Sequence, residues 1–184
     1  RIEAGTYAIA AAMAGGSVRL RGVNPEHIAS LTLLMQQAGV SVETHDDGVT
    51  IARNGERLTA VDVDTQPYPG FPTDLQAQFM TLMAATPGVS LITDKVFPDR
   101  FMHIAELNRM GANIRRDGNT AIVEGVKTLF GAPVMASDLR ASAALLLAGL
   151  VAEGRTDVHR IYHLDRGYEK VEEKLKGLGA TVWR

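Results

Sequence analysis

A threefold internal repeat constrains the fold of this chain more than any other feature of its sequence. Three predicted helices stop at Gly39, Gly111 and Gly179, which lie 72 and 68 residues apart. Each unit has the order lead-in strand, first helix, strand, second helix and hairpin. The units span approximately residues 1–57, 58–128 and 129–184. Three copies of so long a unit favour a closed pseudo-symmetric domain over an open solenoid.

The two helices of each unit differ in how their apolar residues are distributed. The second helices, such as residues 168–177, have one apolar stripe and a charged face, and are therefore amphipathic. The first helices are apolar nearly all round, which is typical of buried helices. They are expected at residues 6–14, 75–85 and 141–152. We therefore expect an α/β fold with three central helices, sheets around them and amphipathic helices outside.

An acidic residue stands at the start of each first helix. Asp74 follows Pro72 and Thr73, Asp138 occupies the matching place in the third unit, and Glu3 is a fainter counterpart. Pseudo-symmetry would bring the three helix N-termini to one end of the domain, where their positive dipole ends favour an anion. For a single aspartate before a helix, however, an ordinary helix cap is the simpler interpretation.

Three arginines accompany these acidic residues. Arg140 lies two residues into the third central helix, whereas Arg100 and Arg166 directly follow Asp99 and Asp165, each expected to cap a second helix. Arginine offers paired donors that suit carboxylate or phosphate groups. The alternative for each arginine is a structural ion pair with a neighbouring aspartate, which internal symmetry does not exclude.

Composition narrows the function further. The chain of 184 residues is 46% hydrophobic, has a formal net charge of −2 and contains no cysteine. Disulfides, thiolate metal sites and a thiol nucleophile are therefore excluded within it. The absence of a long basic run argues against nucleic-acid and polybasic membrane partners. The longest apolar run, residues 141–152, is too short to cross a bilayer. A cytoplasmic protein is the default expectation.

Neither a metal nor a cofactor is expected. The histidines, which show no metal-ligand spacing and are expected at the surface or at strand ends, are His27, His45, His103, His159 and His163. The repeat itself looks incomplete, because the first unit lacks a lead-in strand and the hairpin beginning at Ala180 is cut short. We therefore expect a piece of a larger protein.

Four separated segments resemble the UDP-N-acetylglucosamine enolpyruvyl transferase family. They read PYPGFPTDLQAQFMTLM, DKVFPDRFMHIAELNRMGA, ASDLRASAALLLAGLVAEG and RIYHLDRGYEKVEEKLKGLGA. The likeness covers the whole chain but only the carboxy-terminal half of the family. It implies an inside-out α/β barrel of three repeats, facing a similar amino-terminal domain that is absent here. A short amino-terminal segment of the family also returns to complete the carboxy-terminal domain.

The resemblance also implies an activity. The family transfers the enolpyruvyl group of phosphoenolpyruvate to the 3′-hydroxyl of UDP-N-acetylglucosamine and releases phosphate, in the first committed step of peptidoglycan synthesis. It implies Asp74 as general base and Arg140 and Arg166 at the phosphoenolpyruvate pocket, with Asp138 beside them. The residues assigned to substrate binding are Thr73, Asp74, Val96, Phe97 and Arg100. The mobile loop and the remaining basic residues belong to the other half, so no turnover is expected from this chain alone.

Two alternatives remain open. The related shikimate-pathway enolpyruvyl transferase shares the fold, although FPTDLQAQ and LDRGYEK favour the sugar-nucleotide enzyme. The chain could also be a non-catalytic binding domain that kept the fold, in which Asp74, Arg140 and Arg166 survive as structural residues.

Overall fold

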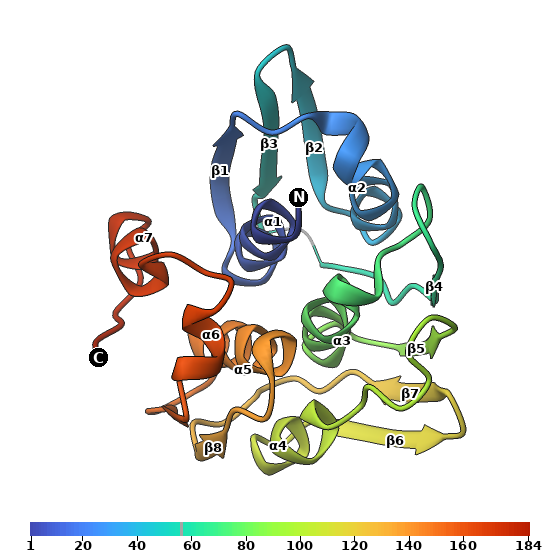
Figure 1. The fold of residues 1–184 in the computed structure, drawn as a ribbon, viewed down its shortest axis with the longest axis vertical. Coiled ribbons are helices and arrows are strands. Elements are labelled where there is room, and N and C mark those ends of the chain that lie inside the picture. Colours follow the sequence, from blue (N-terminus) through green and yellow to red (C-terminus); the bar gives the residue numbers. More distant parts are fainter. Residues whose placement is uncertain (56) are drawn as a thin grey trace.

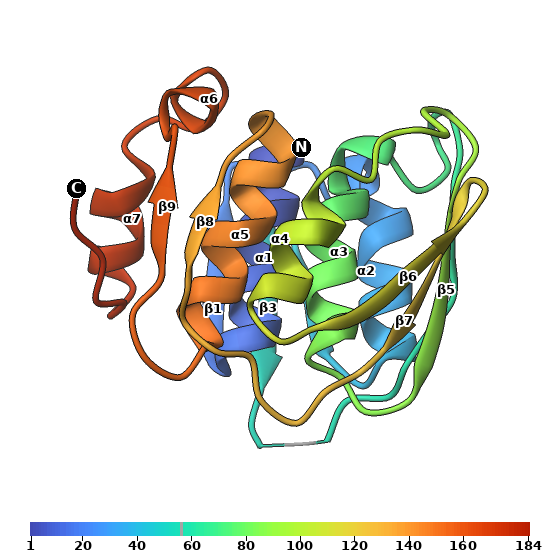
Figure 2. The same cartoon turned by 90° about the horizontal axis from the view of Figure 1, so that it is seen from below.

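Three helices run side by side through the middle of the molecule (Figure 1 and Figure 2). They are α1 (Ile2–Ala14), α3 (Gln76–Ala84) and α5 (Leu139–Val151) in a computed structural model that describes residues 1–55 and 57–184. All nine residues of α3 are buried, and α1 is buried from Gly5 to Met13. The expectation that the helices with apolar residues all round form the centre is confirmed.

The strands of the described residues form three separate sheets around these helices. The first, in the order β1-β3-β2, consists of β1 (Gly16–Arg21), β2 (Ser41–His45) and β3 (Gly48–Arg53). The second, in the order β4-β5-β7-β6, consists of β4 (Val63–Thr65), β5 (Val89–Asp94), β6 (Asn113–Asp117) and β7 (Thr120–Glu124). The third pairs β8 (Pro133–Met135) with β9 (Asp157–His159). The fold is therefore mixed α/β, and closure into a barrel is not part of it as described.

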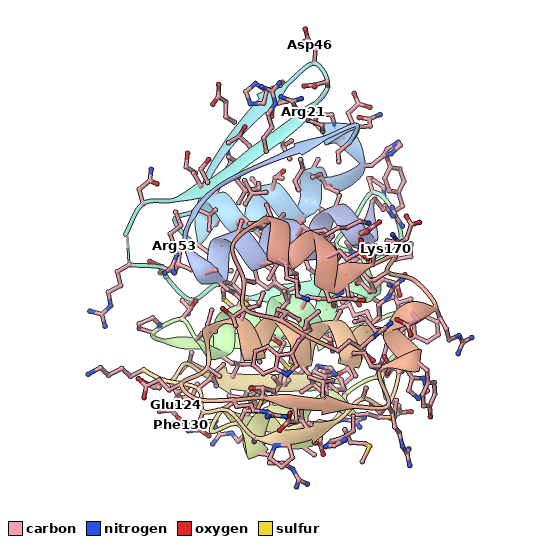
Figure 3. All side chains as sticks on the ribbon, turned by 90° about the vertical axis from the view of Figure 1, so that its left-hand side faces the viewer. Arg21, Asp46, Arg53, Glu124, Phe130 and Lys170 are labelled. Carbon is pink, nitrogen blue, oxygen red and sulfur yellow. The ribbon has the colours of Figure 1, made fainter. Side chains whose placement is uncertain are left out.

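Each lead-in strand pairs in parallel with the strand that follows the central helix. Val63 of β4 lies opposite Ile92 of β5, and Val134 of β8 lies opposite Val158 of β9. The hairpins are antiparallel, and Asp46 marks the tip of the one between β2 and β3 (Figure 3). The hairpins predicted at the ends of the first two units are confirmed.

The second helices lie outside the central ones (Figure 1). They are α2 (Ala29–Gln37), preceded by the 3₁₀ turn η1 (Pro25–Ile28), then α4 (His103–Arg109) and α7 (Val171–Gly177). On α2, Leu31 and Met35 are buried whereas Leu33 is 56% exposed, as an amphipathic stripe requires. No helix within the described ranges is long and apolar enough to span a membrane.

Two predicted caps are wrong. Asp99 does not cap α4, because its carboxylate accepts a hydrogen bond from Nη2 of Arg116 at 2.7 Å and the helix begins only at His103. Asp165 is the last residue of the short helix α6 (Tyr162–Asp165) and forms an ion pair with Arg184. Both carboxylates therefore bind arginines that are distant in sequence, and neither accepts the N–H groups of the helix that it was expected to cap.

Three strands expected from the repeat are short or missing. The lead-in strand of the second unit, which the alternating residues 58–65 predict, covers only Val63–Thr65, and Asp62 Oδ1 accepts the Leu91 N–H at 2.7 Å in place of a backbone partner. The strand after the third central helix, which the sequence predicts over 156–162, ends at His159, because Arg160 adopts a positive φ of 58°. Residues 180–183 form no strand, since no described strand lies beside them.

Candidate functional site

The starts of the three central helices lie at the same end of the molecule (Figure 2). Side-chain contacts join them there. Arg140 at the start of α5 reaches Asp74 in the 3₁₀ turn η2 (Thr73–Leu75), which leads into α3. A Cβ placed on Gly5 of α1 would lie only 2.6 Å from the Leu75 side chain. Three helix N-termini therefore converge, and their dipoles favour negative charge at this end.

Two arginines share one oxygen of the Asp74 carboxylate. Oδ1 accepts hydrogen bonds from Nη1 of Arg100 at 3.0 Å and from Nε of Arg140 at 3.1 Å. Oδ2 accepts none from the residues that the structure describes, and the side chain is 37% exposed. The simple helix-cap interpretation of Asp74 is therefore wrong, whereas the structural ion-pair alternative for Arg100 and Arg140 matches the observed contacts.

The pKa of the Asp74 carboxyl reflects opposing causes. Partial burial alone would raise the pKa, but the hydrogen bonds and positive charges of Arg140 and Arg100 outweigh it, so the pKa lies below its ordinary value of 3.8. Asp74 is therefore ionised at neutral pH, with one oxygen open to a ligand.

Asp138 caps α5, as the sequence predicts. Its Oδ1 accepts the backbone N–H groups of Arg140 at 2.7 Å and Ala141 at 2.8 Å. This cap fixes the first turn of α5 and with it the direction in which the Arg140 side chain leaves the helix. Asp138 thus lies beside the arginine that reaches Asp74.

Three further predicted site residues, Val96, Phe97 and Arg166, form no hydrogen bond or ion pair with Asp74 in the described part of the chain. Phe97 is 55% exposed, and its ring centroid lies 5.6 Å from Cζ of Arg100. Val96, just before it, is half-buried. Arg166 is exposed at the end of α6, and its side chain makes no hydrogen bond or ion pair with any described residue. The structure therefore joins Arg100 and Arg140 to Asp74 but leaves Arg166 outside that set of contacts.

Sequence reasoning missed Asp94, the last residue of β5. The Thr73 hydroxyl donates to Asp94 Oδ2 at 2.7 Å, and the Val96 and Phe97 amides donate to Asp94 Oδ1 at 3.0 and 2.8 Å. An aspartate just before a turn ending in Pro98 is a signal for such side-chain-to-backbone bonds. The bond to Thr73 has no local signal.

The expectation that all histidines lie at the surface or at strand ends is wrong for His103. This first residue of α4 is buried, and its Nε2 has no hydrogen-bond partner among the described residues. Burial lowers the pKa of His103 to about 4; Asp138 raises it, Arg100 lowers it further and Asp94 raises it. A neutral imidazole therefore lies beneath the charged residues of the site. No group of three His, Asp or Glu in the described ranges could hold a metal ion.

Comparison with known proteins assigns the chain to a family. The family model for EPSP synthase (3-phosphoshikimate 1-carboxyvinyltransferase) matches residues 1–175. UDP-N-acetylglucosamine 1-carboxyvinyltransferases from Caulobacter sp. (strain K31) and Rhodopseudomonas palustris (strain BisB18) are 60% and 56% identical over all 184 residues. The chain covers 43% of each of these relatives, less than half their length.

Solved structures agree. The enolpyruvyl transferase NikO from Streptomyces tendae superposes with a TM-score of 0.85 at 29% identity, over 96% of this chain and 43% of that one. EPSP synthase from Acinetobacter baumannii superposes with a TM-score of 0.68 at 21% identity, over 96% of this chain and 43% of that one, which shows a shared fold. The chain therefore belongs to the EPSP synthase family of carboxyvinyl transferases, and within it is homologous to the UDP-N-acetylglucosamine 1-carboxyvinyltransferases.

Proposed function

We propose that the chain is the carboxy-terminal domain of an enzyme that transfers the enolpyruvyl group of phosphoenolpyruvate to the 3′-hydroxyl of UDP-N-acetylglucosamine. This cytoplasmic reaction releases phosphate and begins peptidoglycan synthesis. The observation that carries the proposal is the Asp74 carboxylate where three helix N-termini meet: two arginines hold its Oδ1, and its Oδ2 accepts no hydrogen bond from the described residues. Sequence identity of 55–60% to UDP-N-acetylglucosamine 1-carboxyvinyltransferases over the whole chain supports UDP-N-acetylglucosamine as the acceptor.

The geometry suits a general base. In the proposed addition step, Asp74 Oδ2 takes the proton of the sugar hydroxyl while the hydroxyl oxygen bonds to C2 of phosphoenolpyruvate and C3 gains a proton. Elimination then breaks the C2–O bond to phosphate and removes a proton from C3. Arg100 and Arg140 lower the pKa of Asp74, which weakens it as a base. Movement of either arginine toward a substrate anion would restore basicity.

Charge at this end of the fold suits the second substrate. We assign Arg140 and Arg166 to the carboxylate and phosphate of phosphoenolpyruvate, with Asp138 orienting Arg140. The exposed guanidinium of Arg166 has no protein partner in the described residues, so its donors are free for a ligand. Thr73, Val96, Phe97 and Arg100 then face the sugar nucleotide.

The relatives' remaining part is proposed to supply the rest of the site. We propose that an amino-terminal domain closes over this end and that a segment of it completes the first sheet, giving the inside-out barrel. A groove of about 550 Å³ supports this, because it runs beside β1 and the β1 edge away from β3 has no paired strand in the described residues. Its apolar lining includes Tyr7, Val18, Leu20 and Leu178.

Phosphate release tests the proposal. The chain is joined to the part of the Caulobacter relative that it does not cover, and the chimera is given phosphoenolpyruvate and UDP-N-acetylglucosamine. We expect turnover by the chimera, none by the 184 residues alone, and a loss of roughly 100- to 10,000-fold on Asp74→Asn. Asp47→Asn is the matched control, because Asp47 is also a carboxylate paired with an arginine, Arg19, but lies on the distant β2–β3 hairpin.

Three outcomes would contradict the proposal. Preference for shikimate 3-phosphate would move the chain to the other branch of its family. Turnover by the 184 residues alone would show that the domain needs no partner. A folded chimera that ignores both acceptors would indicate a non-catalytic domain.

A further inference from the structure

Asp94 is a buried carboxylate without a cationic partner among the described residues. It is fully buried at the end of β5, and none of the ion pairs formed by the described residues includes it. Burying a charge in this way is unfavourable unless hydrogen bonds replace the lost water. The hydrogen bonds of Asp94 therefore have to replace the water that its burial removes.

Four donors from three separate segments converge on this carboxylate. Oδ1 accepts from the Thr65 hydroxyl at 2.7 Å and from the two amides of the turn after β5. Oδ2 accepts from the Thr73 hydroxyl at 2.7 Å. The Thr65 hydroxyl in turn accepts the Lys95 N–H at 3.0 Å. One side chain thus joins the end of β4, the turn before α3 and the turn after β5.

We infer that Asp94 is a positioning residue that holds the Val96–Phe97 turn beside Thr73 and Asp74, so that the sugar-nucleotide side of the site is formed before substrate binds. The identity of the ligand rests on the proposed function, whereas the arrangement does not. Groups already held in their binding geometry lose less freedom when a ligand arrives, so affinity is higher.

The carboxylate also sets the direction of one hydrogen bond. Because a carboxylate only accepts, the Thr73 hydroxyl must donate its hydrogen to Asp94 and presents only lone pairs to a ligand. Asparagine at position 94 could keep Oδ1 on the turn amides and donate from Nδ2 to Thr73. Alanine would leave both the turn and Thr73 without their partner.

Steady-state kinetics on the chimera separate these roles. We expect Asp94→Ala to raise KM for UDP-N-acetylglucosamine by roughly 10- to 100-fold, with much smaller changes in kcat and in KM for phosphoenolpyruvate. Asp94→Asn should recover most of the loss, because it keeps the turn in place. Ile92→Val is the matched control: Ile92 is buried on the same strand and lies opposite Val63 and Ala121, so the substitution should lower stability without changing KM.

Amide hydrogen exchange on the 184-residue chain tests the positioning role without substrate. Asp94→Ala should speed exchange of the Val96 and Phe97 amides by about tenfold or more relative to the amides of β5, whereas Asp94→Asn should protect them. If Asp94→Ala does not fold, Asp94→Ser takes its place, since its shorter side chain does not span both sets of donors.

The two proposals fail in different ways. Unchanged exchange at these two amides, or an unchanged KM in an active chimera, overturns the positioning role. An unsubstituted chimera that releases no phosphate contradicts the proposed function, and the exchange result still decides the role of Asp94 in ordering the turn.

Discussion

We expect acid to lower the stability of this protein through the buried residue His103. Its pKa of about 4 lies below the ordinary 6.5 because burial disfavours the imidazolium. As the pH falls from 6.5 towards 4, the unfolded chain binds a proton that the folded chain does not. The free energy of unfolding should therefore fall across this window, by at most roughly 3 kcal/mol.

His103→Leu removes this titration. We expect its free energy of unfolding, measured by urea denaturation from pH 4 to 7, to fall less steeply with acid than that of the unsubstituted chain. Below about pH 3.8, outside this window, both proteins should lose further stability, because Asp74 has a lowered pKa and its contribution is lost as the pH falls through that pKa. Parallel curves for the two proteins would contradict the assignment to His103.

At the scale of elements, the segment that follows β7 crosses close to the segment that follows α3, and this crossing fixes the path of the chain after β7. A Cβ on Gly125 would lie 1.6 Å from the carbonyl oxygen of Thr86, which follows α3. The backbone cannot yield easily, since Gly125 and Val126 donate to Gly88 and Ala84 across the same crossing at 2.9 and 2.8 Å. We expect Gly125→Ala to destabilise the fold by about 2 kcal/mol or more, measured by thermal or urea unfolding.

Gly177→Ala is the matched comparison. Gly177 is the last residue of α7, and a Cβ there would meet no atom within 4 Å. Alanine should stabilise the helix by about 0.5–1 kcal/mol, because it has less freedom to lose on folding. Equal effects of the two substitutions would show that the crossing at Gly125 is not tight.

Most of the elements could be predicted because their signals are local. Apolar residues all round mark the central helices, turn residues mark both hairpins, and Asp138 is placed to cap α5. The failures involve partners distant in sequence. Asp99 turns to Arg116, and Asp94 binds Thr65 and Thr73, which lie 29 and 21 residues away. The site residues could be named by resemblance, but the sharing of Asp74 Oδ1 by two arginines needed the structure.

At the scale of the whole molecule, one set of polar contacts joins α1, α3 and the segment between α6 and α7. The Thr6 hydroxyl of α1 lies 2.8 Å from the Tyr168 hydroxyl, and Gln78 Nε2 of α3 donates to them at 3.1 and 3.3 Å. Tyr168→Phe should lower the free energy of unfolding by about 1 kcal/mol or more, because it leaves buried polar groups short of a partner. Urea denaturation measures this.

Tyr162→Phe is the control for that loss. Its ring is exposed, and its hydroxyl makes no hydrogen bond within the described residues, so little change is expected. Combining Tyr168→Phe with Thr6→Val should give less than the sum of the two losses, because both remove the same contact. Additive losses would mean that the hydroxyls act independently.

The burial of α1 by helices far along the chain has a consequence for synthesis on the ribosome. α5 begins 125 residues after α1 ends. At about 5–20 residues per second, α1 is made roughly 6 to 25 seconds before α5 begins to emerge. During that time a 13-residue apolar helix lacks α5, one of the helices that cover it. The nascent chain therefore exposes the apolar surface of α1 early. Folding without aggregation then depends on how quickly translation proceeds or on a chaperone that covers α1 in the meantime.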